Sequence, residues 1–304
     1  PVLEPPTPPN HDGGISSTMI SHNPTPPTTY PQDWPSYNLA QQNEKERFLA
    51  LLRDLCGTVE QPPQSRGRPR LPLADVVFAA TFKVYSGFSA RRFTSDIQIA
   101  LLDGLIDHAP HFNSTNRYLS DPALTPVLKA LVETSATPLA AVESDFAIDS
   151  TGFATSIYER WFDHKWGKEK SRHTYVKTHF VTGVKTNIVT AVEATPYESA
   201  DAPQLPPLLD RTATTFDVRQ FSADKAYSSR RNVHAVDAVG ATPFIPFKSS
   251  AKGQSKKHAF DGLWYRLWHF YNYQRDEFAA HYHKRSNVET TVAMIKGKFG
   301  AAVK

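Results

Sequence analysis

Residues 282–300, YHKRSNVETTVAMIKGKFG, hold side chains that suit chemistry on a charged substrate. The segment has no proline and no glycine before Gly297, so a helix is allowed. Four apolar residues recur at helical spacing and predict a buried face: Val288, Val292, Ile295 and Phe299. At about 100° per residue, four other residues form a second stripe along the edge of that face: Tyr282, Arg285, Glu289 and Lys296.

Two interpretations of this second stripe are open. An ordinary amphipathic helix turns such residues to water. The sharper hypothesis is that Glu289 is partly buried and points at a charged group, with Arg285 and Lys296 beside it. A carboxylate in that position suits a metal ion, and neighbouring cations suit phosphate.

Two aspartates follow predicted strands upstream. SDFAIDSTGF alternates apolar residues and predicts a strand that ends at Asp149 and turns at DSTG. FDVRQFSADKAY predicts a second strand that stops at Asp224. An aspartate at a strand end can hold a metal, and it is equally the residue of an ordinary Asx-turn.

These sequence motifs together resemble those of the DDE transposases of the insertion-sequence family four and five group. The spacing of Tyr282, Arg285, Glu289 and Lys296 is similar to that family's signature, and DSTG and ADKAY resemble its two aspartate motifs. Where Ala226 stands, the family often has glycine. The resemblance covers roughly residues 66–300.

The resemblance implies a fold and a site. The fold class is α/β, a ribonuclease-H-like mixed sheet flanked by helices and preceded by a small helical domain. Asp149, Asp224 and Glu289 would be both the catalytic residues and the ligands of Mg²⁺, for which Mn²⁺ can substitute. The activity would be cleavage at transposon ends and strand transfer into target DNA, with contacts to DNA from Tyr282, Arg285 and Lys296.

The charge of the chain is uneven. Residues 248–304 hold 11 Lys and Arg against 4 Asp and Glu, a local +7, whereas the whole chain carries only +4. This excess suits a polyanion such as double-stranded DNA. Four lysines of the polar loop at residues 248–258 are candidate phosphate contacts: Lys248, Lys252, Lys256 and Lys257. A plain solubilising loop is the alternative.

Three regions are predicted along the chain. Residues 1–42 form a disordered Pro-rich lead, because residues 1–36 hold 10 of the 24 prolines. Residues 43–137 carry helical patterns and form a helical N-terminal domain, in which HFNSTN from His111 separates two helices. DNA binding and a purely structural role are both open for this domain. Residues 138–304 form the catalytic domain, which we expect to be truncated at its C-terminal end.

The remaining expectations concern partners and location. The element ends and the target DNA are the expected partners, with a homodimer assembled on DNA and no membrane. Cys56 is the only cysteine, which excludes an intrachain disulfide and fits a reducing compartment. The expected location is the prokaryotic cytoplasm, at the nucleoid. Two other functions stay open, a ribonuclease-H-like nuclease without strand joining and a catalytically inactive DNA-binding remnant.

Overall fold

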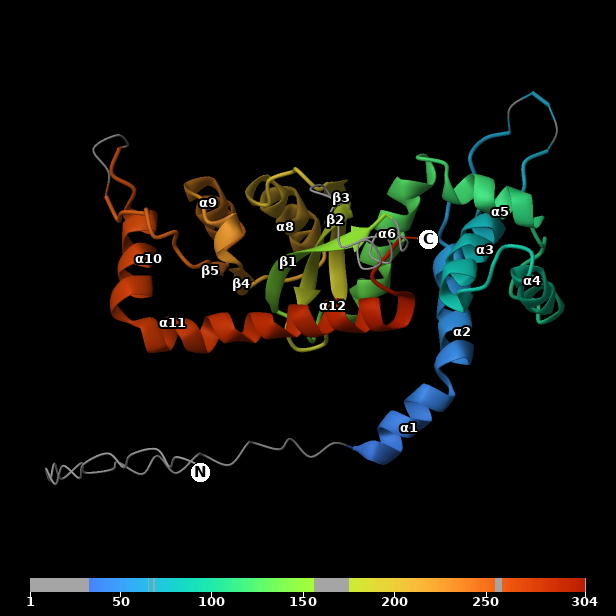
Figure 1. Cartoon of the computed structure of the whole chain (residues 1–304), viewed down its shortest axis with the longest axis horizontal. Helices are drawn as coiled ribbons and strands as arrows, with labels where there is room; N and C mark the ends of the chain where they lie inside the picture. The colour runs from blue at the N-terminus through green and yellow to red at the C-terminus, as the bar shows by residue number, and fades with distance from the viewer. Residues whose placement is uncertain (1–32, 65, 68, 156–174, 255–258, 304) are drawn as a thin grey trace, which may run out of the picture. The chain divides into compact units, whose positions relative to one another are not determined.

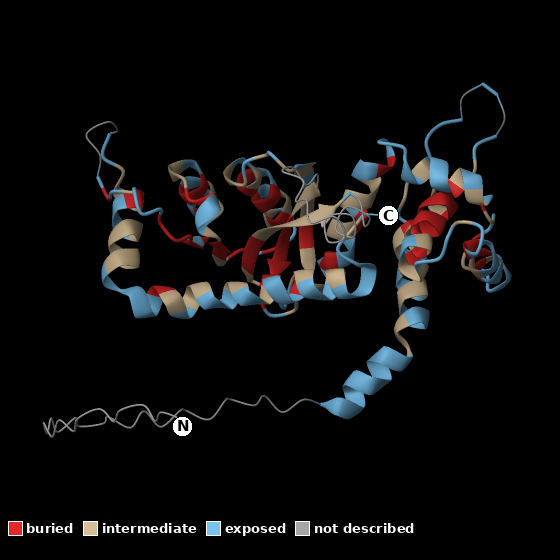
Figure 2. Ribbon diagram, in the orientation of Figure 1, coloured by how far each residue is buried: buried red, intermediate tan, exposed pale blue. Residues whose placement is uncertain are grey.

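The computed structural model describes residues 33–64, 66–67, 69–155, 175–254 and 259–303. Contacts along the chain define two units, residues 1–44 and residues 45–304. The first unit contains α1 (Trp34–Gln42), a helix exposed along its whole length (Figure 2). The sequence analysis had placed these residues in a disordered lead. That prediction was wrong here, because the Asp33 carboxylate accepts the Ser36 N–H and caps the helix, and Pro35 suits its first turn.

Five helices precede the sheet in the second unit. They are α2 (Glu44–Cys56), α3 (Leu73–Ser86), α4 (Phe93–Leu102), α5 (Phe112–Leu119) and α6 (Leu124–Ala136), and a 3₁₀ turn, η1 (Thr137–Leu139), follows α6. The buried face of α3 is the centre of their apolar cluster, with Phe78 and Phe82 fully enclosed. HFNSTN was predicted to separate helices, but it begins α5. The His111 ring accepts the Asn113 N–H and supplies the cap that starts this helix.

A five-stranded mixed sheet follows, in the order β3-β2-β1-β4-β5. Its strands are β1 (Asp145–Ala154), β2 (Tyr175–Gly183), β3 (Val189–Pro196), β4 (Gln220–Ala223) and β5 (Thr242–Phe244). The first three strands form an antiparallel meander, and β4 runs parallel to β1. β5 is parallel to β4 and lies at the edge of the sheet. The α/β class with a mixed sheet and preceding helices is therefore confirmed.

Helices cover both faces of this sheet. η2 (Ala202–Gln204) leads into α8 (Leu205–Ala213), η3 (Lys225–Tyr227) follows β4, and α9 (Arg230–Ala238) precedes β5. Because side chains alternate along a strand, Phe146 and Ile148 of β1 face the cluster that includes α8 and α9. Ala147 faces the other way and packs against Val288. Figure 1 shows α8 and α9 on the side of the sheet opposite the C-terminal helix that carries Val288.

The C-terminal region is a series of helices. They are α10 (Gly262–Tyr273), α11 (Arg275–Tyr282), η4 (His283–Arg285) and α12 (Ser286–Phe299). The sequence predicted one helix from residue 282. Instead, α11 ends at Tyr282 and one 3₁₀ turn leads into α12. Of the predicted apolar face of α12, Val288 is fully buried and Val292 and Ile295 are half-buried, whereas Phe299 is exposed.

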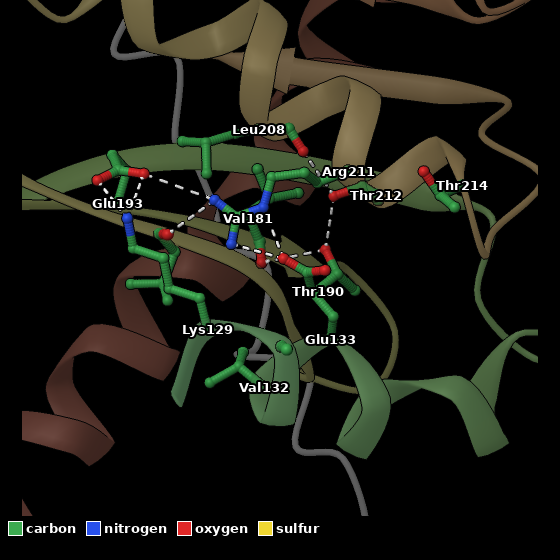
Figure 3. Close-up of polar contacts among 12 residues, drawn as sticks. Lys129, Val132, Glu133, Val181, Thr190, Glu193, Leu208, Arg211, Thr212 and Thr214 are labelled. Atoms are coloured by element: carbon green, nitrogen blue, oxygen red, sulfur yellow. Dashed lines mark hydrogen bonds and ion pairs between the residues drawn. The ribbon is translucent and has the colours of Figure 1, made fainter. Parts of the chain in front are cut away.

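Ion pairs join α6 to the sheet and to α8 (Figure 3). Lys129 of α6 donates to both carboxylate oxygens of Glu193 on β3, at 2.6 and 2.7 Å. Arg211 of α8 donates to Glu133 of α6 at 2.6 Å and lies 3.5 Å from Glu193. This network crosses the domain boundary expected at residue 137, so α6 is fixed to both regions. The division into domains stays a prediction.

Within the described part of the chain, the helices are all too short or too polar to cross a membrane.

Candidate active site

Asp149 lies in the middle of β1 and faces α12. The strand was predicted to end at this residue, but it continues to Ala154 because β2 pairs with it along its full length. One carboxylate oxygen accepts the Ser150 N–H at 2.9 Å and the other accepts Arg285 Nη1 at 3.0 Å. Burial raises the pKa of Asp149, and the negative charges of Asp224 and Glu289 raise it further, against the opposing effects of Ser150 and Arg285.

Asp224 follows the last residue of β4, as predicted. β1 and β4 are parallel neighbours, and Ile148 is paired with Ala223. Asp149 and Asp224 each come directly after this pair, so they lie next to each other on adjacent strands. The Asp224 carboxylate accepts the Lys225 N–H at 2.6 Å and caps the 3₁₀ turn η3. This arrangement explains why the charge of Asp224 acts on Asp149 across 75 residues of sequence.

Arg285 joins α12 to the sheet at this point. Its Nη1 binds Asp149, and its Nη2 binds Glu289 Oε1 at 2.8 Å. The guanidinium carbon lies 5.6 Å from the centre of the Tyr282 ring, a cation–π distance. Three of the four residues of the predicted polar stripe therefore meet around one guanidinium group.

Glu289 differs from its prediction in burial. Its side chain is 60% exposed, whereas the sequence analysis expected it to be partly buried. The reason is the rotation of α12, because Val288 points directly at the sheet and the next residue lies at the rim of the buried face. The Glu289 carboxylate reaches the site through Arg285.

Lys296, the fourth residue of the stripe, contacts β1 two turns further along α12. Its Nζ donates to Thr151 Oγ1 at 2.5 Å and lies 5.4 Å from the centre of the Phe153 ring. Thr151 and Phe153 share the strand face of Asp149, because they lie two and four residues beyond it. Arg285 and Lys296 thus place two cations along the same strand face.

The donor chemistry suits a hard divalent cation, although the side chains do not form a closed cage. Asp149 and Glu289 already converge on one positive group, the Arg285 guanidinium, which stands where a cation would sit. Across the described residues, no three His, Cys, Asp or Glu side chains are grouped closely enough to hold a metal ion. A metal ion held by Asp149 and Glu289 therefore requires Arg285 to move away.

A cavity of roughly 430 Å³ opens beside Asp224. Aromatic and positively charged residues dominate its wall, which is formed by Asp224, Lys225, Pro246, Tyr271, Arg275, Phe278, Ala279, Tyr282 and His283. Phe278 and Tyr282 stack at 5.9 Å between ring centres. Such a wall suits a phosphate group with an aromatic base or sugar next to it.

Two of the four predicted lysine contacts lie within the described residues. Lys248 and Lys252 are exposed in the loop that precedes α10. Lys256 and Lys257 lie outside the described residues. Their predicted role in binding phosphate stays a prediction.

A buried hydrogen-bond network behind the carboxylates was missed by the sequence analysis. Tyr227 Oη lies 2.9 Å from His179 Nδ1, and its hydroxyl also interacts with the Ser150 side chain. His179 Nε2 lies 3.3 Å from Thr195 Oγ1. The network ties the residue after Asp149 to the turn after Asp224. Burial lowers the pKa of His179, so the ring is neutral, and burial raises the pKa of Tyr227.

Comparison with known proteins gives a family match and distant structural likenesses. Residues 140–303, more than half of the chain, match the family described as "Transposase DDE domain". A piggyBac transposase solved by cryo-electron microscopy in a synaptic complex with hairpin DNA is 11% identical, with a TM-score of 0.33. The match covers 82% of this chain and 64% of that chain. None of the curated proteins matches the sequence.

Proposed function

Because the chain belongs to the transposase DDE domain family, we propose that it cleaves DNA at the ends of a mobile element and joins them to target DNA. Asp149, Asp224 and Glu289 are the proposed catalytic residues. The expected partners are the element ends and the target, with a homodimer assembled on DNA because two ends must be held together.

One observation carries this proposal. Asp149 and Asp224 occupy neighbouring positions on parallel strands, and Arg285 of η4 binds both Asp149 and Glu289 of α12. Burial is the main cause of the raised pKa of Asp149, and the negative charges of Asp224 and Glu289 raise it further, so these carboxylates repel one another. Asp149, Asp224 and Glu289 would hold a divalent cation that offsets this repulsion, and the bound ion would supply activation of an attacking oxygen and stabilisation of the leaving oxygen of a phosphodiester.

The residues of the chain have distinct proposed roles around that chemistry. The sheet fixes the positions of Asp149 and Asp224, whose carboxylate oxygens are the proposed metal ligands. Glu289 supplies the third carboxylate from α12. Arg285 and Lys296 bind DNA phosphates near the cut, because both cations lie along the strand face of Asp149. Tyr282 packs against the end nucleotides. Losing one charged phosphate contact costs about 1.5–3 kcal/mol of binding.

Nicking of supercoiled plasmid DNA tests the proposal. We expect nicking with Mg²⁺ or Mn²⁺ and none with a chelator. Asp149→Asn, Asp224→Asn and Glu289→Gln should each abolish it. Asp217→Asn is the matched control, because its carboxylate is largely exposed and pairs only with Arg219 among the ion pairs seen. Nicking that survives in all three variants refutes the assignment of these residues.

A second assay separates a transposase from a nuclease. A labelled DNA end with a free 3′-hydroxyl is incubated with circular target DNA and the metal ion. A transposase transfers the label into the circle, whereas a nuclease without strand joining only cuts it. Absence of both products at saturating protein concentration supports an inactive DNA-binding remnant.

A further inference from the structure

A row of aromatic rings lies on the outer face of α10. Tyr265, His269 and Tyr273 are spaced four residues apart, so they lie above one another on the helix. Tyr273 is 73% exposed and Tyr265 is 36% exposed, and Phe260, just before the helix, is 65% exposed. Exposed rings that lie next to one another mark an interaction surface more than scattered ones do.

The rings of this row contact one another. The ring centres of Tyr265 and His269 are 4.3 Å apart, and those of His269 and Tyr273 are 5.2 Å apart with an interplanar angle of 15°. Phe260 extends the row to Tyr265 at 5.7 Å. We call Phe260, Tyr265, His269 and Tyr273 the aromatic row.

The opposite face of α10 fixes the row in place. Trp264 is buried and packs on Phe247, with ring centres 4.7 Å apart. The indole N–H of Trp264 donates to the Lys252 carbonyl at 2.9 Å, and that of Trp268 donates to the Ala251 carbonyl at 3.1 Å. The helix cannot rotate to bury the row without losing these contacts. A rigid ring loses little conformational freedom when a ligand stacks on it.

The sequence around the row carries an excess of positive charge. Residues 248–277 contain six Lys and Arg against three carboxylates, Asp261, Asp276 and Glu277, a local +3. The Asp261 carboxylate is already paired, because it lies 2.8 Å from Arg230 and 2.9 Å from His234. Arg266 is exposed on α10 itself, and Lys252 is exposed on the loop held by Trp264. Exposed rings among cations are the combination that binds unpaired nucleic acid.

The C-terminal end of α10 lies next to the candidate active site. Tyr271, on the helix face opposite the row, and Arg275, the first residue of α11, line the cavity that contains Asp224. A strand with one phosphate at the carboxylates can therefore continue through this cavity to the C-terminal end of α10.

We propose that the aromatic row stacks on unpaired bases of a DNA strand that leaves the active site, while Arg266 and Lys252 neutralise its phosphates. The identity of the polymer rests on the proposed function, whereas the stacking surface rests on α10 alone. Unpaired bases expose both faces to stacking, whereas bases in a duplex are already stacked. The aromatic row should therefore favour single-stranded over double-stranded DNA.

The test is binding of fluorescein-labelled oligothymidylate, followed by fluorescence anisotropy in a chelator so that no cleavage occurs. Tyr265→Ala with Tyr273→Ala should weaken binding by at least about tenfold, since stacking contributes on the order of 1–3 kcal/mol per base. The corresponding Phe substitutions should bind as the unchanged protein does, because they keep the rings. Tyr37→Ala, an exposed tyrosine of α1, is the matched control and should bind normally.

Several results would overturn the proposal. It fails if the double Ala variant binds oligothymidylate with unchanged affinity, or if duplex affinity falls by the same factor. It also fails if binding is unchanged and sedimentation shows a loss of self-association, because the row is then a contact between copies. The single variant Tyr273→Ala should fold normally, because this side chain is 73% exposed, and it should still bind oligothymidylate more weakly than the unchanged protein does. Because the assay needs no catalysis, a protein that does not nick DNA can still pass or fail it.

Discussion

The phenol of Tyr227 offers a sharp test of how the two aspartates are held. Tyr227→Phe removes one oxygen atom and keeps the ring that fills the core beside β1 and β4. The lost hydroxyl lies 2.9 Å from His179 Nδ1, and both residues are almost fully buried. Water cannot replace it in this position, so one ring nitrogen of His179 loses its partner.

The size of the effect follows from that loss. A buried polar group without a partner costs about 1–3 kcal/mol, and the retained ring adds no cavity term. We therefore expect the free energy of unfolding to fall by about 1–3 kcal/mol in Tyr227→Phe. For a domain of this size, about 2 kcal/mol lowers the Tm by roughly 4–8 °C.

Urea unfolding followed by tryptophan fluorescence measures this change. Tyr273→Phe is the control, because its side chain is largely exposed, and its stability should stay within about 0.5 kcal/mol of the unchanged protein. If the free energy of unfolding of Tyr227→Phe equals that of the unchanged protein, the hydrogen bond between Tyr227 and His179 does not stabilise the fold. A decrease no larger than that of Tyr273→Phe would lead to the same conclusion.

Three further predictions address the surroundings of the site. Gly183→Ala should lower stability by about 1–3 kcal/mol in thermal unfolding, because its Cβ would meet the buried Glu143 carboxylate at 2.5 Å; unchanged stability contradicts the packing there. Asp149→Asn should abolish nicking and raise the Tm at neutral pH. The Tm should rise because the raised pKa of Asp149 means that its negative charge opposes folding, and a lower Tm contradicts that reasoning. Burial lowers the pKa of His179 in the folded protein. The stability that the neutral ring contributes is therefore fully present above the unfolded pKa of 6.5 and is lost as pH falls through the folded pKa. His179→Asn should flatten this pH dependence of the free energy of unfolding in urea titrations, and an unchanged pH profile contradicts the prediction.

Much of the sheet was predictable, because its strands carry local signals. The apolar pattern of FDVRQFSADKAY predicted β4, and the alternation in SDFAIDSTGF predicted the first half of β1. The end of β1 was not predictable from local patterns. Ser150, Thr151 and Gly152 look like a turn, and only their pairing with β2 keeps them in a strand. Tertiary pairing overrode local propensity there.

The candidate site was predictable in its members but not in its contacts. The spacing on α12 predicted that Arg285 and Glu289 share an edge, and the strand patterns pointed to Asp149 and Asp224. The sequence did not reveal that Arg285 binds two carboxylates at once, since this depends on how α12 rotates over the sheet. Nor did any local signal pair His179 with Tyr227, which lie 48 residues apart.

Anomalous scattering from crystals soaked in Mn²⁺ tests the central claim most directly. The account predicts a peak between Asp149, Asp224 and Glu289, with the Arg285 guanidinium turned away from the two carboxylates that it binds without metal. A protein that nicks DNA with Mn²⁺ but shows no peak at these carboxylates, or a peak at other residues, would contradict the account.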